Sequence, residues 1–244
     1  MFVTIRKWTA VYILTIMALF TCVAVIIWRG TAVNASRVQD LVQRPVLVID
    51  AGHGGMDGGA VAEDGTRESQ INLDVALKTE QVAGFLGIPT VMTRREDISL
   101  HSEDATTIRQ QKNSDLKNRA AMVNATPGAF LLSIHQNTLQ GMPSVHGGQV
   151  FYNGKPGGEH WAQEVQASLN EIINEGAKDT RRGGGDIYLL DRSNCPGILV
   201  ECGFLSNASE AKLLKDPRYQ LRLALILAGA TARAMTWEGE GATS

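Results

Sequence analysis

Between Pro45 and Met235 the chain alternates short, continuous apolar runs with longer amphipathic stretches, an order that few folds accommodate. The apolar runs predict buried strands at residues 46–49, 90–92, 129–134, 149–152, 187–190 and 198–200. The amphipathic stretches predict helices at residues 68–86, 113–124, 160–173 and 216–235. Strands that lack a polar face are typical of a parallel sheet covered by helices on both faces. We therefore expect one α/β domain with a mostly parallel, twisted sheet flanked by helices.

Three of the predicted strands lead into an ionisable residue. His53 follows the first strand inside a glycine-rich turn, His135 ends the third, and Glu201 ends the last. Ligands of open α/β sheets bind at the carboxyl ends of the strands, so these three side chains are expected to converge. A single histidine in such a place is more often structural, but the repetition favours a site. The remaining histidines lack this context and are expected in loops or on the surface: His101, His146 and His160.

Glu68 is a candidate third ligand for a metal ion. It begins the first predicted helix, close to the apolar stripe that contains Ile71, and an inward-facing carboxylate is costly unless it is paired or metal-bound. The alternative is a solvent-facing carboxylate that complements the helix dipole. Beside His53 and His135 the metal interpretation is favoured, because two imidazoles and a carboxylate form the ligand set of many catalytic zinc sites. Related divalent ions could use the same ligands.

The turn around His53 holds five glycines, Gly52, Gly54, Gly55, Gly58 and Gly59, which permit a tight bend and a close approach to a metal. A phosphate-binding loop is disfavoured because the Lys-Ser/Thr ending is missing and Asp57 stands where the dinucleotide motif needs its third glycine.

Glu201 is the candidate acid and base. A carboxylate beside a zinc ion can take a proton from the attacking water and return it to the departing amine. The alternative is a structural ion pair with Arg119 or Arg182.

Several motifs occur in the order in which a known family carries them. They are Val46-Leu-Val-Ile-Asp-Ala-Gly-His53-Gly-Gly-Met-Asp-Gly-Gly-Ala60, Glu68-Ser-Gln-Ile-Asn-Leu73, Thr93-Arg94, Asn118-Arg119, Ser133-Ile-His135-Gln-Asn137 and Leu199-Val-Glu201-Cys-Gly-Phe-Leu-Ser-Asn207. From about residue 46 to 235 the chain resembles the zinc N-acetylmuramoyl-L-alanine amidases of the amidase-3 type.

The resemblance implies cleavage of the amide between N-acetylmuramic acid and L-alanine in peptidoglycan, so the partners are the glycan strand and its stem peptide. It implies one Zn²⁺ ion held by His53, Glu68 and His135, with Glu201 as the catalytic acid and base. Asn137 and Arg119 stand in the same motifs and are the candidates for substrate binding.

The long segment 93–119, together with the N-terminal apolar stretch and residues 200–207, is similar to the spore-cortex subgroup of this family. In that subgroup, stem-peptide removal prepares muramic acid for conversion to the δ-lactam that germination enzymes recognise, and some members depend on an activating lipoprotein. Two departures concern substrate fit: Gln136, where a small or apolar residue is common, and the glycine-rich loop 181–185. The alternatives are a non-catalytic or partner-dependent wall-binding protein, and a zinc peptidase or carbohydrate deacetylase.

Residues 9–28 carry no charge over about 20 residues, the length of one helical membrane crossing. We expect a short cytoplasmic N-terminus at 1–8, a transmembrane anchor at 9–28, a linker at 29–45, an amidase catalytic domain at 46–236 outside the cytoplasm, and a flexible tail at 237–244. The alternative is a secreted protein, because Val33-Asn34-Ala35 has the small-residue pattern of a signal-peptidase site.

The net charge of the N-terminal segment has the opposite sign from that of the rest of the chain. Residues 1–44 carry five basic residues and one acidic residue, so the remaining 200 residues have a net charge of −6. An acidic domain has no electrostatic footprint for nucleic acid. The three cysteines predict no disulfide, because Cys195 and Cys202 flank an extended run of about 20 Å and a bridge tolerates only about 4.4–6.8 Å between Cα atoms.

Overall fold

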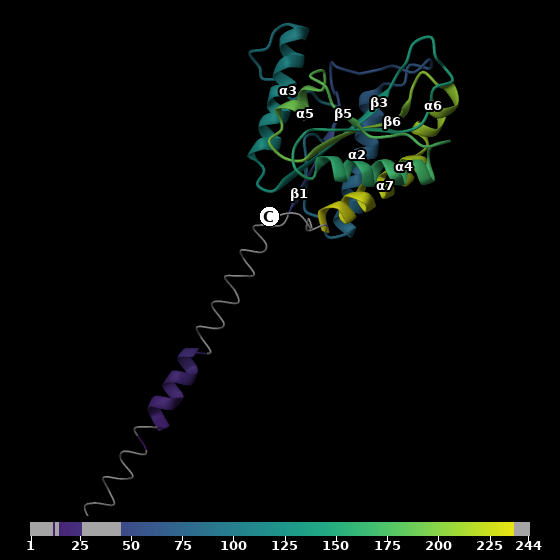
Figure 1. Ribbon diagram of the computed structural model, residues 1–244. Coiled ribbons are helices and arrows are strands. Elements are labelled where there is room, and N and C mark those ends of the chain that lie inside the picture. Colours follow the sequence, from purple (N-terminus) through teal and green to yellow (C-terminus); the bar gives the residue numbers. More distant parts are fainter. Residues whose placement is uncertain (1–11, 13–14, 26–44, 237–244) are drawn as a thin grey trace, which may run out of the picture. The chain divides into compact units, whose positions relative to one another are not determined.

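The computed structural model describes residues 12, 15–25 and 45–236 (Figure 1). The chain divides into two units, Met1–Arg44 and Pro45–Ser244. The predicted segments 1–8 and 237–244, nearly all of the linker and part of the stretch 9–28 lie outside the described residues. Residues 15–25 are helical. Within the described ranges, no helix combines the length and the apolar character that a membrane crossing requires.

The second unit contains a six-stranded sheet with the order β2-β1-β3-β6-β4-β5. The strands are β1 (Val46–Ala51), β2 (Thr90–Met92), β3 (Ala129–Asn137), β4 (Gln149–Tyr152), β5 (Arg181–Arg182) and β6 (Gly197–Phe204). The first four strands in this order are mutually parallel, as predicted, whereas β4 runs antiparallel to β6 and pairs in parallel with β5. The carboxyl ends of β1, β3 and β6 therefore lie at one edge.

Helices cover both faces of this sheet (Figure 1). They are α2 (Glu68–Phe85), α3 (Ile108–Ala125), α4 (Gly158–Ile172), α5 (Tyr188–Arg192), α6 (Ala208–Lys215) and α7 (Pro217–Thr236). On one face, Leu47, Ile134 and Val200 join the core formed with α2, α4 and α7. On the other face, Leu131 and Leu199 pack with residues of α3 and α5. The prediction of an α/β domain with a helix-flanked sheet is confirmed.

One local prediction is wrong, and two short elements, β5 and α6, were not predicted. The run at 187–190 was expected to be a strand, but α5 begins at Tyr188, and Leu189 and Leu190 pack as helical residues against the sheet. A short apolar run fits a buried helical turn as well as a strand, and only packing distinguishes them. Helix α6 was not predicted. Its N-cap is Asn207, whose side chain accepts hydrogen bonds from the backbone N–H groups of Ser209 and Glu210.

Candidate active site

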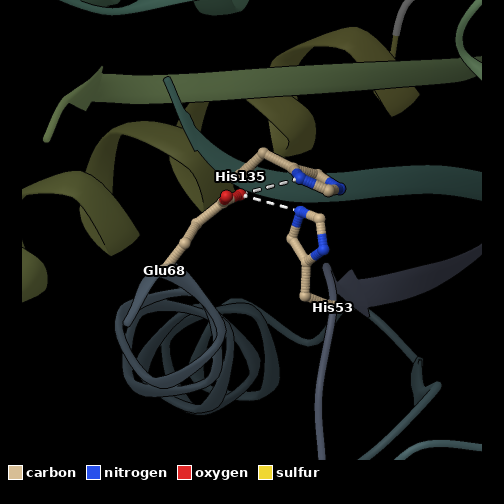
Figure 2. Close-up of side chains that lie close together, drawn as sticks. All are labelled: His53, Glu68 and His135. Atoms are coloured by element: carbon tan, nitrogen blue, oxygen red, sulfur yellow. Dashed lines mark hydrogen bonds and ion pairs between the residues drawn. The ribbon is translucent and has the colours of Figure 1, made fainter. Parts of the chain in front are cut away.

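His53, Glu68 and His135 converge at the carboxyl edge of the sheet (Figure 2). His53 lies in the turn after β1, Glu68 is the first residue of α2, and His135 lies in β3. Nε2 of His53 is 3.3 Å and Nδ1 of His135 is 3.0 Å from Oε1 of Glu68. One potential ligand atom from each side chain lies within 4.8 Å of the other two. Glu68 is buried, so the alternative of a solvent-facing first-turn carboxylate is wrong.

The turn that carries His53 has unusual backbone geometry. His53 has a φ of 59°, a left-handed conformation that side chains other than glycine adopt rarely and that is frequent at functional sites. Two of the glycines are required by the space beside the candidate ligands. A Cβ at Gly52 would lie 2.3 Å from the His135 ring, and a Cβ at Gly59 would lie 2.5 Å from Oε2 of Glu68. The glycines thus allow the backbone to pass directly beside two of the candidate ligands.

Asp57 orients the His53 ring. Its Oδ2 atom lies 2.9 Å from Nδ1 of His53, while its Oδ1 atom pairs with Nζ of Lys112 at 2.8 Å. Because Nδ1 is engaged by Asp57, Nε2 is directed toward Glu68, which is the usual second-layer arrangement around a metal-binding histidine. The sequence reasoning missed this role. The available signal was the position of Asp57 four residues after His53 within one tight turn.

Buried donors fix the Glu68 carboxylate. Its Oε2 atom accepts a hydrogen bond from the backbone N–H of Ala60 at 2.8 Å, and its Oε1 atom accepts from Nδ2 of Asn72 and from the backbone N–H of Gln136, both at 3.1 Å. Burial by itself raises the pKa of Glu68, but the hydrogen bonds and charges of His135 and His53 outweigh it and hold the pKa well below the usual range. Glu68 is therefore an anionic candidate ligand.

The cluster fits a divalent cation. Two imidazole nitrogens and one carboxylate oxygen face a common point, the donor set that zinc prefers in catalytic sites. Burial tends to lower the pKa of His53, but the Asp57 and Glu68 carboxylates together raise it to about 10. The two carboxylates thus stabilise positive charge at the point where the ligand atoms meet, and a bound cation would supply that charge in place of a proton.

Glu201 lies directly beside the cluster. It is the Cα partner of His135 across β3 and β6, so the two side chains emerge on the same face of the sheet. No group in the described part of the chain donates a hydrogen bond to its buried Oε2 atom. Burial raises the pKa of Glu201 to about 7, the negative charge of Glu68 adds to this, and His135 and His53 oppose it. A carboxyl group with such a pKa exchanges a proton readily near neutrality.

Arg119 is not the ion-pair partner of Glu201, since all five of its N–H donors are used elsewhere. Nε and Nη2 bind the Asp115 carboxylate, Nη1 binds Asp50 and the carbonyl of Ala51, and Nη2 also binds the carbonyl of His53. Burial by itself raises the pKa of Asp50. The charge of Arg119 and the hydrogen bonds from Arg119 and Ser133 together outweigh burial and lower the pKa to about 2. Arg119 thus fixes the end of β1 and the turn above it, and its predicted substrate contact stays a prediction.

A cleft of about 320 Å³ opens onto Glu201, His53 and His135 on the face that α3 and α5 cover. Lys112 of α3 and Tyr188 of α5 contribute to its walls. The other substrate-binding candidate, Asn137, ends β3 and lines a separate cavity. The structure therefore brings together four of the six predicted site residues, places Arg119 against the His53 turn, where it also lines the cleft, and leaves Asn137 to one side.

The fold and the site define an α/β enzyme with a candidate metal-dependent hydrolase centre at the edge of its sheet. Residues 47–233 match the amidase-3 family, described as N-acetylmuramoyl-L-alanine amidase, and the chain belongs to this family. The protein is therefore a peptidoglycan amidase.

Individual relatives agree with this family. The chain is 34% identical over 196 residues to the germination-specific N-acetylmuramoyl-L-alanine amidase of Bacillus subtilis (strain 168), which covers 80% of this chain and 81% of the relative. A solved structure of the CwlD amidase from Clostridioides difficile in complex with the GerS lipoprotein matches with a TM-score of 0.74 and 34% identity, over 78% of this chain and 98% of that one. The solved structure of an N-acetylmuramoyl-L-alanine amidase from Clostridium difficile 630 matches with a TM-score of 0.66 and 27% identity, over 81% of this chain and 100% of that one.

Proposed function

We propose that this amidase is zinc-dependent and acts on spore-cortex peptidoglycan, where it prepares muramic acid for δ-lactam formation. The observation that carries the metal part is the convergence of Nε2 of His53, Oε1 of Glu68 and Nδ1 of His135 beside Glu201. The spore part is supported by the identity to a relative whose name is germination-specific.

In this proposal His53, Glu68 and His135 hold one Zn²⁺ ion. When bound, the ion supplies positive charge that polarises the scissile carbonyl and makes a water molecule more acidic. Glu201, as a carboxylate, accepts the proton of the water that attacks the carbonyl carbon. The carbon–nitrogen bond then breaks, and Glu201 returns the proton to the alanine nitrogen. The products are a muramic acid with a free carboxyl group and a stem peptide with a free amine.

The proposed mechanism is tested by Glu201→Gln, which keeps the size of the side chain but cannot accept a proton. The variant is expected to bind zinc with wild-type stoichiometry and to release no stem peptide from purified sacculi, as measured by mass spectrometry of the digest. Glu171→Gln, on the exposed face of α4, is the matched control and is expected to remain active. Undiminished peptide release by Glu201→Gln would contradict the mechanism.

The spore role has a separate test. Spores that lack this amidase are expected to contain cortex without muramic δ-lactam, which muropeptide analysis measures directly. A normal δ-lactam content in such spores would refute the spore-cortex assignment while leaving the amidase activity intact.

We also propose an activating lipoprotein as a partner. The supporting observation is that the solved CwlD amidase, to which this chain is similar, was captured in complex with the GerS lipoprotein. Addition of a cognate lipoprotein is expected to raise peptide release by the purified chain at a fixed zinc concentration. Equal rates with and without the lipoprotein would refute the requirement.

We further infer that the catalytic domain acts outside the cytoplasm, where peptidoglycan lies. The uncharged stretch 9–28 supports export, either as a retained anchor or as a signal that is cleaved after Ala35. N-terminal sequencing of the protein from membrane and medium fractions distinguishes these two outcomes. Recovery of the chain from the cytoplasm alone would contradict both.

A further inference from the structure

A second cavity, of about 610 Å³, lies next to the catalytic cleft. The cleft overlies β1, β3 and β6, whereas this second cavity is lined by Gln149 and Phe151 of β4 and by Asn137 and Phe204 at the ends of β3 and β6. Gln149 is the Cα partner of Glu201 across β4 and β6. The cavity therefore begins one strand away from the catalytic carboxylate, a spacing of about 4.8 Å.

Two cations line this cavity, Lys178 and Arg181. Nζ of Lys178 donates hydrogen bonds to the carbonyls of His146 and Gly147, at 2.6 and 2.7 Å, and lies 5.4 Å from the centre of the Phe204 ring. These contacts fix Lys178 in place. Arg181 is exposed on β5. Burial lowers the pKa of Lys178, and the nearby positive charge of Arg181 lowers it further. Lys178 and Arg181 thus bring two positive charges together at the wall of this cavity.

The two cavities differ in charge. Asp179 is the one acidic residue that lines the second cavity, so its walls carry a net positive charge. In the catalytic cleft, Arg119 is neutralised by a buried salt-bridge network. Outside that network, the lining residues include three carboxylates, those of Asp57, Asp186 and Glu201, and one cation, Lys112. The walls of the second cavity would therefore attract an anionic part of the substrate.

The substrate has a matching polarity. The lactyl carboxyl group of muramic acid is consumed in the scissile amide, so the sugar side is uncharged, whereas the stem peptide carries free carboxylates beyond L-alanine. Strand β5 lies two strand spacings from β6, or about 10 Å. An extended peptide covers this distance in about three residues at roughly 3.3–3.6 Å each. A carboxylate on the second or third residue of the stem would therefore reach Arg181.

We propose that Lys178 and Arg181 form a carboxylate-binding subsite for the stem peptide, so that the peptide leaves Glu201 toward β4 and β5 and the glycan lies over the cleft between α3 and α5. This inference rests on the proposed cleavage reaction and adds the direction in which the stem peptide lies relative to Glu201. Arg181 supplies the specificity, because a guanidinium binds a carboxylate in a paired geometry. Lys178 supplies fixed positive charge at the cavity wall.

The test uses the full chain and two synthetic muramyl tripeptides, which differ only in whether the peptide carboxylates are free or amidated. Wild type is expected to favour the free form through KM. Arg181→Gln is expected to raise KM for the free form about tenfold with little change in kcat, and to leave the amidated form unchanged. Arg182→Gln is the matched control, because Arg182 is its exposed neighbour on β5 but does not line the cavity.

A binding measurement separates this inference from the proposed function. Calorimetry of the free and amidated tripeptides with each variant reports the subsite without any turnover. Equal affinity of wild type for the two peptides, or equal effects of Arg181→Gln and Arg182→Gln, would overturn the subsite. A preserved carboxylate preference in binding, together with no hydrolysis of either muramyl tripeptide by wild type with or without a cognate lipoprotein, would instead support the subsite and refute the proposed function.

Discussion

Replacing Asn72 with leucine removes the side chain that joins Glu68 to the sheet. Asn72 is fully buried in α2, and its Nδ2 atom donates to the carbonyl of Gly52 at 3.2 Å and to Oε1 of Glu68 at 3.1 Å. Its Oδ1 atom accepts a hydrogen bond from Nε2 of Gln136 at 3.2 Å. The two acceptors determine which way the Asn72 amide faces, and that orientation in turn requires Gln136 to present its NH₂ group.

The magnitude follows from the groups that are left unpaired. Asn72→Leu conserves volume but removes one hydrogen bond to a carboxylate, worth about 1.5–3 kcal/mol, and two neutral ones of about 1 kcal/mol each. It also leaves Nε2 of Gln136 buried without its partner, while the Gly52 carbonyl keeps its hydrogen bond from Nη2 of Arg94. We therefore expect a loss of about 3–6 kcal/mol in the free energy of unfolding, together with weaker zinc binding because the Glu68 carboxylate loses a support.

Gln136→Leu is the matched comparison. It removes only one hydrogen bond, and it also removes the Oε1 atom of Gln136, which has no partner among the residues described and is costly to bury. The two effects nearly cancel, so the expected change is about 0–1 kcal/mol. Urea denaturation of the full chain, followed by zinc titration against a chelator, measures both quantities. Equal destabilisation by Gln136→Leu and Asn72→Leu would refute the reasoning.

Three further outcomes are expected. Gly59→Ala places a Cβ against the Glu68 carboxylate and is expected to reduce zinc affinity at least tenfold, whereas Gly65→Ala, also at a positive φ but with open space around it, imposes only backbone strain and keeps the affinity. Glu201 has a folded-state pKa of about 7 against 4.5 for the free side chain, so the zinc-free chain should lose stability as pH rises from about 4.5 to 7. Glu201→Gln should remove about 2 kcal/mol of that loss in urea melts at pH 4.5 and 6, where histidines of the unfolded chain are still mostly protonated; an unchanged pH dependence would disprove it. Asp57→Asn should weaken zinc binding about 10–100-fold while the circular dichroism spectrum stays that of wild type, and unchanged affinity would remove this residue from the metal site.

The candidate ligands could be identified from the sequence because they occupy equivalent positions. His53, His135 and Glu201 each follow an apolar run, and parallel strands bring such positions to one edge whatever their separation along the chain. Glu68 was less certain, since a carboxylate in the first turn of a helix could equally have faced water. The packing of α2 against the sheet decides that Glu68 faces inward.

The wrong strand prediction and the unforeseen contacts of Arg119 have physical causes of their own. The run at 187–190 is too short to have a clear period, so its helical state depends on how it packs beneath α3. Arg119 stands in a motif with the ligands, yet its position in the fold directs every donor to Asp50, Asp115 and the backbone after β1. No pattern in the sequence shows these contacts, and the substrate contact of Arg119 stays a prediction.

The sequence by itself determined the α/β class, the edge of the sheet that carries the candidate site, and the four candidate residues for metal and acid–base chemistry, because these follow from periodicity and from the ends of strands. Tertiary structure alone decided which groups support the candidate site and which cavities open beside it. Asp57 behind His53, Asn72 behind Glu68, and the cations at the mouth of the second cavity come from segments that meet only in the fold. Hydrogen bonds and burial depend on distances in space, and those are set when the helices pack onto the sheet.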